Sequence, residues 1–247
     1  MIKFVLLFTL LVFSQTAVAQ NTMRNLDELI DTSGVGWKFV KLLVDSAANQ
    51  VEILPCDSAK GKDALYHTQV TSHSPLGGVV YSTGGILVDH GWIRILGSGH
   101  PRLPRSLPDW NKGKSFTEFG EKPTYLLIAD DAAGGFYAID GGEFGGKPGI
   151  IWYLSPDTME WGSLDLTYSQ FLHFCFNNDL NEFYAGIRWK TWQQDVPKLS
   201  GSECFTFTPP LYTKEGKDIA KDDLKAVPVE EQYKESMIIL KAIKGEK

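Results

Sequence analysis

Short apolar runs separated by glycine dominate the middle of the chain and predict β-strands. Three of them, GVVYS, GILVD and WIRIL, lie within residues 76–97. Their length and β-branched content favour strands over helices. A second block follows at 124–129, 135–140 and 149–154, where TYLLIA, GFYAID and GIIWYL are separated by the turn-forming segments DDAAG and GGEFGGKP. MEWGSL continues this block, so we expect a sheet built mainly from 76–97 and 124–162.

Apolar residues recur at a helical spacing near both ends of the chain, which predicts amphipathic helices. Asn25 is placed to cap a helical segment that breaks at 32–34 and then continues to residue 48. Thr167 can cap YSQFLHFCF, and a last helix is expected at 229–243.

The first residues have the three parts of a secretory signal peptide. Lys3 gives a short positive start, 4–13 is an apolar run, and 17–19 is a small-residue cleavage site. The apolar run is far shorter than the roughly 20 residues that span a bilayer, so no integral membrane segment is expected after cleavage. We expect 1–19 to be removed and the mature chain to be exported, as a periplasmic or extracellular protein.

Composition divides the mature chain into a domain and a tail. Residues 20–212 hold all the expected strands and form a single α+β domain in this interpretation. The charged segment 213–247 is expected to be an appendage. Its first part is solvated, and its second part, after Pro228, forms the predicted amphipathic helix.

Charge and cysteine content restrict the possible functions. The chain has 24 Lys and Arg against 30 Asp and Glu, a formal charge of −6, so we expect no nucleic-acid partner. Cys56, Cys175 and Cys204 have no metal-ligand or catalytic spacing. Two of them can pair in an oxidising compartment, but their spacing does not choose which. Cys175 lies between two phenylalanines and is expected to be a buried, inert thiol.

Two acidic or glycine-rich segments have features of ligand-binding loops but fit tight turns better. GGEFGGKP at 141–148 matches the first seven positions of a phosphate-binding loop, yet Pro148 replaces the required Ser or Thr and a strand follows instead of a helix. Asp130, Asp131 and Asp140 could ligate calcium, but they lack the alternating spacing of such loops. Asp and Gly between strands are typical of tight turns. We expect hairpin turns here, and neither a metal nor a cofactor.

The segment STGGILVDHGWIRILGSGH, residues 82–100, holds an aspartate and two histidines. Strand alternation turns Asp89 and His90 to opposite faces unless the chain bends at Gly91, so a hairpin turn is the simpler interpretation. The sequence has no HExxH, GxSxG or clear Ser/His/Asp grouping. The alternative is a hydrolase that uses His90 with Asp89 or Asp131 as acid/base residues. The candidate ligand or partner site comprises Asp89, His90, Trp92, His100, Asp130 and Asp131.

Aromatic residues are abundant near the second block of strands and the helices that follow it. These include Trp152, Tyr153, Trp161, Trp189 and Trp192. Such residues most often fill a core, and they can also line a pocket or a partner surface.

The blocks GGILVDHGWIRILGSG and ADDAAGGFYAIDGGEFGGKPGIIWYLSPDT resemble a bacterial family of uncharacterised proteins, over about residues 25–212. The second block is also distantly similar to the SUKH superfamily, in LLIADDAAGGFYAID, GIIWYL and LTYSQFLHF. That resemblance implies an antiparallel sheet flanked by helices and a protein partner, because most SUKH proteins are binding modules and many are immunity proteins. Typical immunity proteins act in the cytoplasm, whereas this chain carries an export signal. We expect a secreted or periplasmic, non-catalytic binding module.

Overall fold

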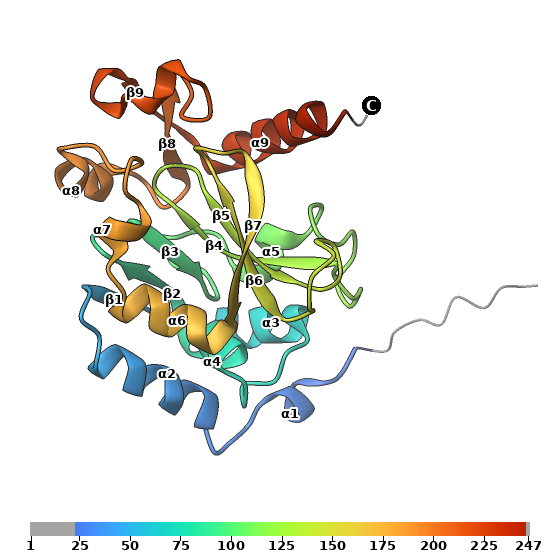
Figure 1. Ribbon diagram of the computed structural model, residues 1–247. Coiled ribbons are helices and arrows are strands. Elements are labelled where there is room, and N and C mark those ends of the chain that lie inside the picture. The colour runs from blue at the N-terminus through green and yellow to red at the C-terminus, as the bar shows by residue number, and fades with distance from the viewer. Residues whose placement is uncertain (1–22, 246–247) are drawn as a thin grey trace, which may run out of the picture.

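Seven strands follow one another across a single antiparallel sheet, in the order of the sequence (Figure 1). The computed structural model describes residues 23–245. Each strand pairs with the next one, from β1 with β2 to β6 with β7. The expected α+β class, with an antiparallel sheet flanked by helices, is confirmed. The strands are β1 (Val51–Pro55), β2 (Thr83–Val88), β3 (Ile93–Leu96), β4 (Tyr125–Asp131), β5 (Phe136–Asp140), β6 (Ile150–Ser155) and β7 (Glu160–Thr167).

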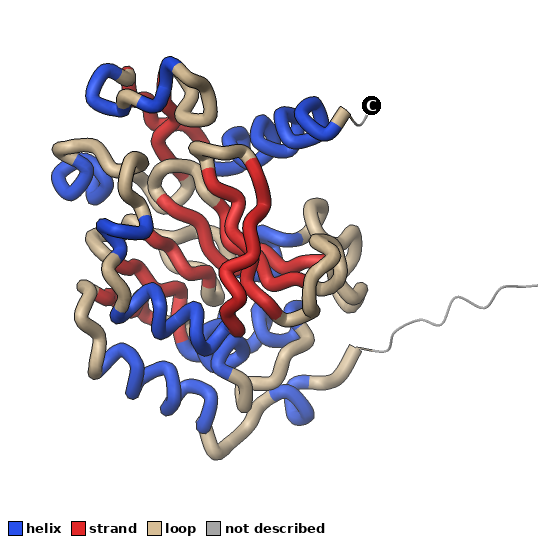
Figure 2. Tube along the Cα trace, in the orientation of Figure 1, coloured by secondary structure: helices blue, strands red, loops and turns tan. Residues whose placement is uncertain are grey.

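Helices surround this sheet (Figure 2), and two of them begin at the capping residues that the sequence predicts. Asn25 and Thr167 each form a capping box, at the starts of α1 and α6. The helices are α1 (Leu26–Leu29), α2 (Val35–Asp45), α3 (Ser58–Thr68), α4 (Pro75–Ser82), α5 (Leu107–Asn111), α6 (Tyr168–Asn177), α7 (Leu180–Phe183), α8 (Trp192–Asp195) and α9 (Val229–Lys244). Short 3₁₀ turns lie at Val196–Lys198, Glu215–Lys217 and Ile219–Lys221.

Consecutive residues of β5 separate the two faces of the sheet. The ring of Tyr137 lies 5.0 Å from that of Phe171 in α6, whereas the ring of Phe136 lies 5.1 Å from that of Tyr233 in α9. Side chains alternate between the two sides of a strand. Helix α6 therefore covers one side, called here the α6 face, and helix α9 packs on the other, the α9 face.

The run GVVYS is helical, which corrects the first of the three strands expected within 76–97. The hydroxyl of Ser74 accepts the amide N–H of Gly77 at 3.1 Å, and Pro75 occupies the first helical turn. Gly78 then lies against α2, where a Cβ would be 2.7 Å from the backbone of Gly36. Capping and close helix packing outweigh the β-branched content of this short run.

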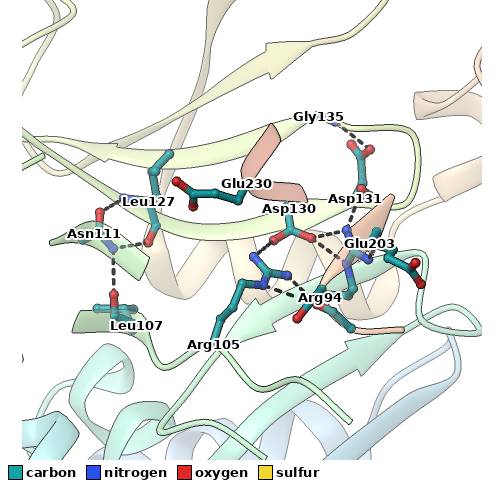
Figure 3. A network of polar contacts seen from close by, with 12 residues as sticks. Arg94, Arg105, Leu107, Asn111, Leu127, Asp130, Asp131, Gly135, Glu203 and Glu230 are labelled. Atoms are coloured by element: carbon teal, nitrogen blue, oxygen red, sulfur yellow. Dashed lines mark hydrogen bonds and ion pairs between the residues drawn. The ribbon is translucent and has the colours of Figure 1, made fainter. Parts of the chain in front are cut away.

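The proline-rich connection after β3 contains one short helix, α5, which a buried asparagine ties to the sheet (Figure 3). The side-chain amide of Asn111 donates to the carbonyls of Leu107 and Leu127, at 2.9 and 2.8 Å. Its oxygen accepts the amide N–H of Leu127 at 2.8 Å. The three prolines of this segment predict an irregular connection or a single turn, and the hydrogen bonds of Asn111 fix the one helical turn in place.

The C-terminal segment adds a second, two-stranded sheet and the predicted helix. β8 (Glu203–Thr208) pairs along its length with β9 (Asp223–Pro228), a strand that the charged composition did not predict. Helix α9 follows directly and buries Tyr233 and Leu240. The hydroxyls of Tyr233 and Tyr125 lie 2.7 Å apart, so the tail is joined to the main sheet by a hydrogen bond as well as by packing.

The three cysteines are free thiols. Cys175 and Cys204 are buried, and burial raises the pKa of both thiols, that of Cys204 to about 12. The expectation that Cys175 is buried is confirmed, and its inertness stays a prediction, because the thiolate is the reactive form.

The predicted signal peptide, 1–19, lies outside the described residues. No helix within residues 23–245 combines the length and the apolar character that a bilayer crossing requires.

Candidate functional site

The hairpin between β2 and β3 turns through residues with an uncommon backbone conformation. Asp89 and His90 have positive φ angles of 51° and 59°, and Gly91 follows at 83°. This left-handed region costs a non-glycine residue roughly 1–2 kcal/mol, although Asp and His adopt it more readily than most. Such strain persists where surrounding contacts impose it, and it is concentrated at functional sites. The interpretation of Asp89 and His90 as a hairpin turn is confirmed.

Arg188, in the segment between α7 and α8, braces this turn. Its guanidinium pairs with the carboxylate of Asp89 at 2.6 Å, and only 6% of the arginine side chain is exposed. The same guanidinium lies 4.7, 5.1 and 3.9 Å from the ring centroids of Trp92, Tyr184 and Trp192. Ion pairing and desolvated cation–π contacts together offset the strain of the turn. Trp92 is fully buried, so it supports the turn from the core.

The braced turn presents His90 at a cleft of about 590 Å³, a volume typical of ligand pockets. His90 is exposed, and its ring meets the edge of Trp192 with centroids 6.0 Å apart. The lining comes from strands β1 to β3, from the loop after β3 and from the segment 196–201. It combines charged, polar and apolar side chains, among them Gln50, Glu52, Leu87, Arg94, Arg102 and Leu199.

Positive charge exceeds negative charge in this cleft, although the chain as a whole is acidic. Arg94 and Arg102 line it, against the single carboxylate of Glu52. Arg102 pairs with Glu52 through both terminal nitrogens, and the two side chains are 56% and 47% exposed. An exposed pair of this kind contributes about 0.2–1 kcal/mol, so a ligand can compete for it. The cleft therefore favours a ligand with an anionic group.

Arg94 reaches the cleft from a buried network (Figure 3). Its Nε donates to Oδ1 of Asp130 at 2.5 Å, and Nη1 of Arg105 donates to Oδ2 at 2.5 Å. Further guanidinium N–H groups donate to the carbonyls of Glu203 and Gly201. Asp130 is fully buried, and two arginines share its single negative charge. The two arginines therefore carry one positive charge more than Asp130 neutralises. Backbone carbonyl dipoles stabilise this excess charge, which makes the electrostatic potential in the cleft more positive.

Asp131 lies on the opposite face of the sheet from Asp130, as strand alternation requires. Its Oδ1 accepts the amide N–H groups of Ala133 and Gly135, both at 2.9 Å, and its Oδ2 accepts the hydroxyl of Tyr153 at 2.7 Å. Burial raises the pKa of the Asp131 carboxyl. These bonds close the β4–β5 turn, so the predicted turn function of this aspartate is confirmed.

Asp140 performs the same function in the glycine-rich loop between β5 and β6. Its Oδ1 accepts the amide N–H groups of Gly142 and Phe144, at 2.8 and 3.2 Å. A strand follows this loop, which confirms a hairpin in place of a phosphate-binding loop. Among residues 23–245, no three His, Cys, Asp or Glu side chains are grouped so that they could hold a metal ion.

His100 shapes the loop that brings Arg102 to the cleft. The backbone of His100 pairs with that of Leu103, and its Nδ1 accepts the amide N–H of Arg102 at 3.1 Å. His100 itself is half-buried beside the cleft.

The predicted site residues fall in separate places, and the pairs required by a hydrolase are not formed. Within the described residues no hydrogen bond joins His90 or His100 to Asp130 or Asp131. Asp89 faces an arginine instead of His90. The structure places His90 in the lining of the cleft and Asp89 against Arg188 in the same turn, while Asp130 binds the cleft residue Arg94 and Asp131 lies on the other face of the sheet.

Sequence reasoning missed the four arginines that build this site, Arg94, Arg102, Arg105 and Arg188. One signal was available, because Arg94 interrupts the apolar run WIRIL. A charged residue buried in a strand requires a partner, and Asp130 on the adjacent strand supplies it. The other three lie in irregular segments, where periodicity carries no information.

These features define an α+β protein with one antiparallel meander and a polar cleft at its β2–β3 hairpin. The chain belongs to the family described as "Protein of unknown function DUF2625", whose model matches residues 26–232. It is 42% identical over 211 residues to an uncharacterised protein of Haemophilus influenzae (strain Rd), a match that covers 85% of this chain and 92% of the relative. It is also 42% identical over 192 residues to the uncharacterised protein YbfG of Escherichia coli (strain K12), over 78% of this chain and 87% of the relative.

The matches confirm the resemblance to a bacterial family of unknown function. No solved structure gave a significant match. The distant resemblance to the SUKH superfamily stays a prediction.

Proposed function

We propose that the mature chain is an exported, non-catalytic binding module that holds an acidic segment of a protein partner in the cleft beside His90. The observation that carries the proposal is the strained turn. Two consecutive non-glycine residues are held at positive φ by a buried arginine, and the result is an exposed imidazole at a cleft. A fold that needed only a tight turn would be served by glycine or asparagine at these positions.

The character of the lining supports an acidic partner. Arg102 is exposed, and a ligand carboxylate can replace Glu52 as its ion-pair partner. Arg94 belongs to the buried network and also lines the cleft, so its positive charge acts there. Leu87 and Leu199 give the same cleft an apolar surface. A peptide with a carboxylate beside an apolar side chain meets both requirements. Because the chain is acidic overall, attraction to such a partner is local to this cleft.

The arrangement favours binding over catalysis. No side chain of the described chain hydrogen-bonds to His90, whose ring packs against Trp192, so the base–orienter pair typical of a hydrolase is not formed here. The aspartates proposed as its partners are held by Arg188 and Tyr153.

The test is capture of the partner from the envelope and culture medium, with the tagged mature chain as bait and mass spectrometry of what is retained. Three variants are compared with the natural chain. R102A removes the exposed cation, and E52Q removes the carboxylate that pairs with it. H173A, the control, removes an exposed histidine on α6, away from the cleft.

The proposal expects opposite effects from the two cleft substitutions. R102A should weaken the affinity for the captured partner at least about tenfold, and E52Q should strengthen it, because the partner no longer competes with Glu52. H173A should leave affinity unchanged. If neither R102A nor E52Q changes the affinity for the captured partner, the cleft is not its binding site. A stoichiometric metal ion in native mass spectra would refute the proposal that the module has no cofactor.

A further inference from the structure

A second hollow lies on the α9 face, far along the sheet from the cleft. Its volume is about 640 Å³, and it is lined by the β6–β7 hairpin, the loop 141–149 and helix α9. Trp152 and Trp161 are only half-buried and line this hollow, although aromatic residues most often fill a core. We call this hollow the aromatic groove.

Four aromatic rings form one continuous wall of the aromatic groove. The ring of Phe144 lies 5.2 Å from Trp152, 4.7 Å from Trp161 and 5.7 Å from Tyr125, with tilted planes in each case. All four rings are half-buried and all four line the groove. The faces of aromatic rings carry negative potential and attract cations that approach within about 6 Å.

Two carboxylates without ion-pair partners in the described chain line the groove beside its rings. Glu143 and Glu160 line it, both exposed, and neither forms an ion pair with any residue in 23–245. The lining also contains two lysines, of which Lys114 is held by Glu230 at 2.8 Å and Lys241 is in no ion pair within 23–245. Aromatic faces and unpaired carboxylates both select for a positively charged ligand.

An unsatisfied donor adds a further requirement. The indole N–H of Trp152 is buried and has no acceptor in the described chain. It lies under the glycine-rich loop, where a Cβ on Gly146 would be 2.9 Å from the indole ring. Residues 145–149 of this loop are exposed and include three glycines, so an incoming group can displace them while Phe144 keeps its place in the wall. A ligand with an oxygen acceptor would satisfy the donor.

We propose that the aromatic groove binds a small organic ammonium ion that also carries a hydrogen-bond-accepting oxygen. The ammonium lies against the rings of Phe144, Trp152 and Trp161, between the carboxylates of Glu143 and Glu160. The oxygen accepts the indole N–H of Trp152. This site is separate from the cleft beside His90 and does not depend on the function proposed for that cleft.

Choline is the probe, because it combines a quaternary ammonium with a hydroxyl, and 3,3-dimethylbutan-1-ol is its neutral counterpart of the same shape. The indole N–H resonances of the ¹⁵N-labelled mature protein are followed during titration with each compound. The proposal expects the Trp152 and Trp161 signals to move with choline, while those of the buried Trp92 and Trp110 stay in place. Choline should bind at least about fivefold more tightly than the alcohol.

Variants separate the charge from the shape of the groove. E143Q/E160Q should weaken choline binding at least about fivefold, whereas the matched control E231Q/E235Q, which neutralises two exposed acids of α9 outside the groove lining, should not. W161A tests the rings directly and should abolish the selectivity between choline and the alcohol. Equal binding of the two compounds, equal effects of the two double variants, or tighter binding of a lysine-rich peptide than of choline would overturn the proposal.

Discussion

Replacing Asp130 with asparagine tests the energetic role of the buried network beneath the cleft. The carboxylate is completely buried, and the two arginine side chains that bind it are 4% and 10% exposed. D130N keeps the volume but leaves two guanidinium groups with no counter-charge. Breaking a buried ion pair from one side costs about 3–5 kcal/mol. With a urea dependence of about 2 kcal/mol per molar, the unfolding midpoint should fall by about 2 M.

The control is E52Q, which removes one carboxylate from an arginine pair of the same chemistry that is about half exposed. Its cost should stay below about 1 kcal/mol. Urea unfolding followed by tryptophan fluorescence measures both variants. Adding R94M to D130N removes one of the stranded charges and should recover part of the loss. If D130N and E52Q lower the unfolding free energy equally, or R94M deepens the D130N defect, the account of the network is refuted.

Three further predictions concern other parts of the molecule. Iodoacetamide on the native protein at pH 8 should alkylate the half-buried Cys56 and spare Cys175 and Cys204, because burial raises the pKa of those two thiols. Peptide mass spectrometry measures the labelling, and rapid alkylation of Cys175 or Cys204 would contradict their packing. G78A should lower the unfolding free energy by about 1–3 kcal/mol, because its Cβ would meet the backbone of α2 at 2.7 Å, and an unchanged midpoint would refute that contact. Hydrogen bonds from the hydroxyl and the amide N–H of Ser33 lower the pKa of the Asp31 carboxyl to about 2. The contribution of this carboxylate to stability is therefore complete above about pH 4 and is lost as the pH falls toward 2. D31N should remove this part of the acid dependence, and identical acid profiles would contradict it.

Most of the sheet could be predicted because strands, turns and caps are encoded locally. Glycine and aspartate between alternating apolar runs predict the β4–β5 and β5–β6 hairpins, and Asp131 and Asp140 close them as expected. The capping residues Asn25 and Thr167 likewise begin the helices predicted for them. These features depend on residues within a few positions of one another.

Features that depend on distant residues were not predicted. GVVYS is a helix because Gly78 packs on Gly36 of another helix, which its own five residues do not reveal. Strand β9 is visible only through its pairing with β8. The candidate site includes the β2–β3 turn, but the arginines around it come from three separate segments, namely β3, the loop after β3 and the loop between α7 and α8. Asp130 and Asp131 are adjacent in sequence, and strand alternation assigns them to different faces of the sheet.

The most direct test of the central claim is photo-crosslinking in the intact envelope. A benzophenone amino acid placed at position 199, in the lining of the cleft, should give an ultraviolet-dependent adduct with one partner protein. The adduct should decrease with R102A and increase with E52Q, and the same label at position 173 on α6 should give none. No adduct at position 199, or an equal adduct at position 173, would contradict the proposal that the cleft beside His90 is a partner-binding site.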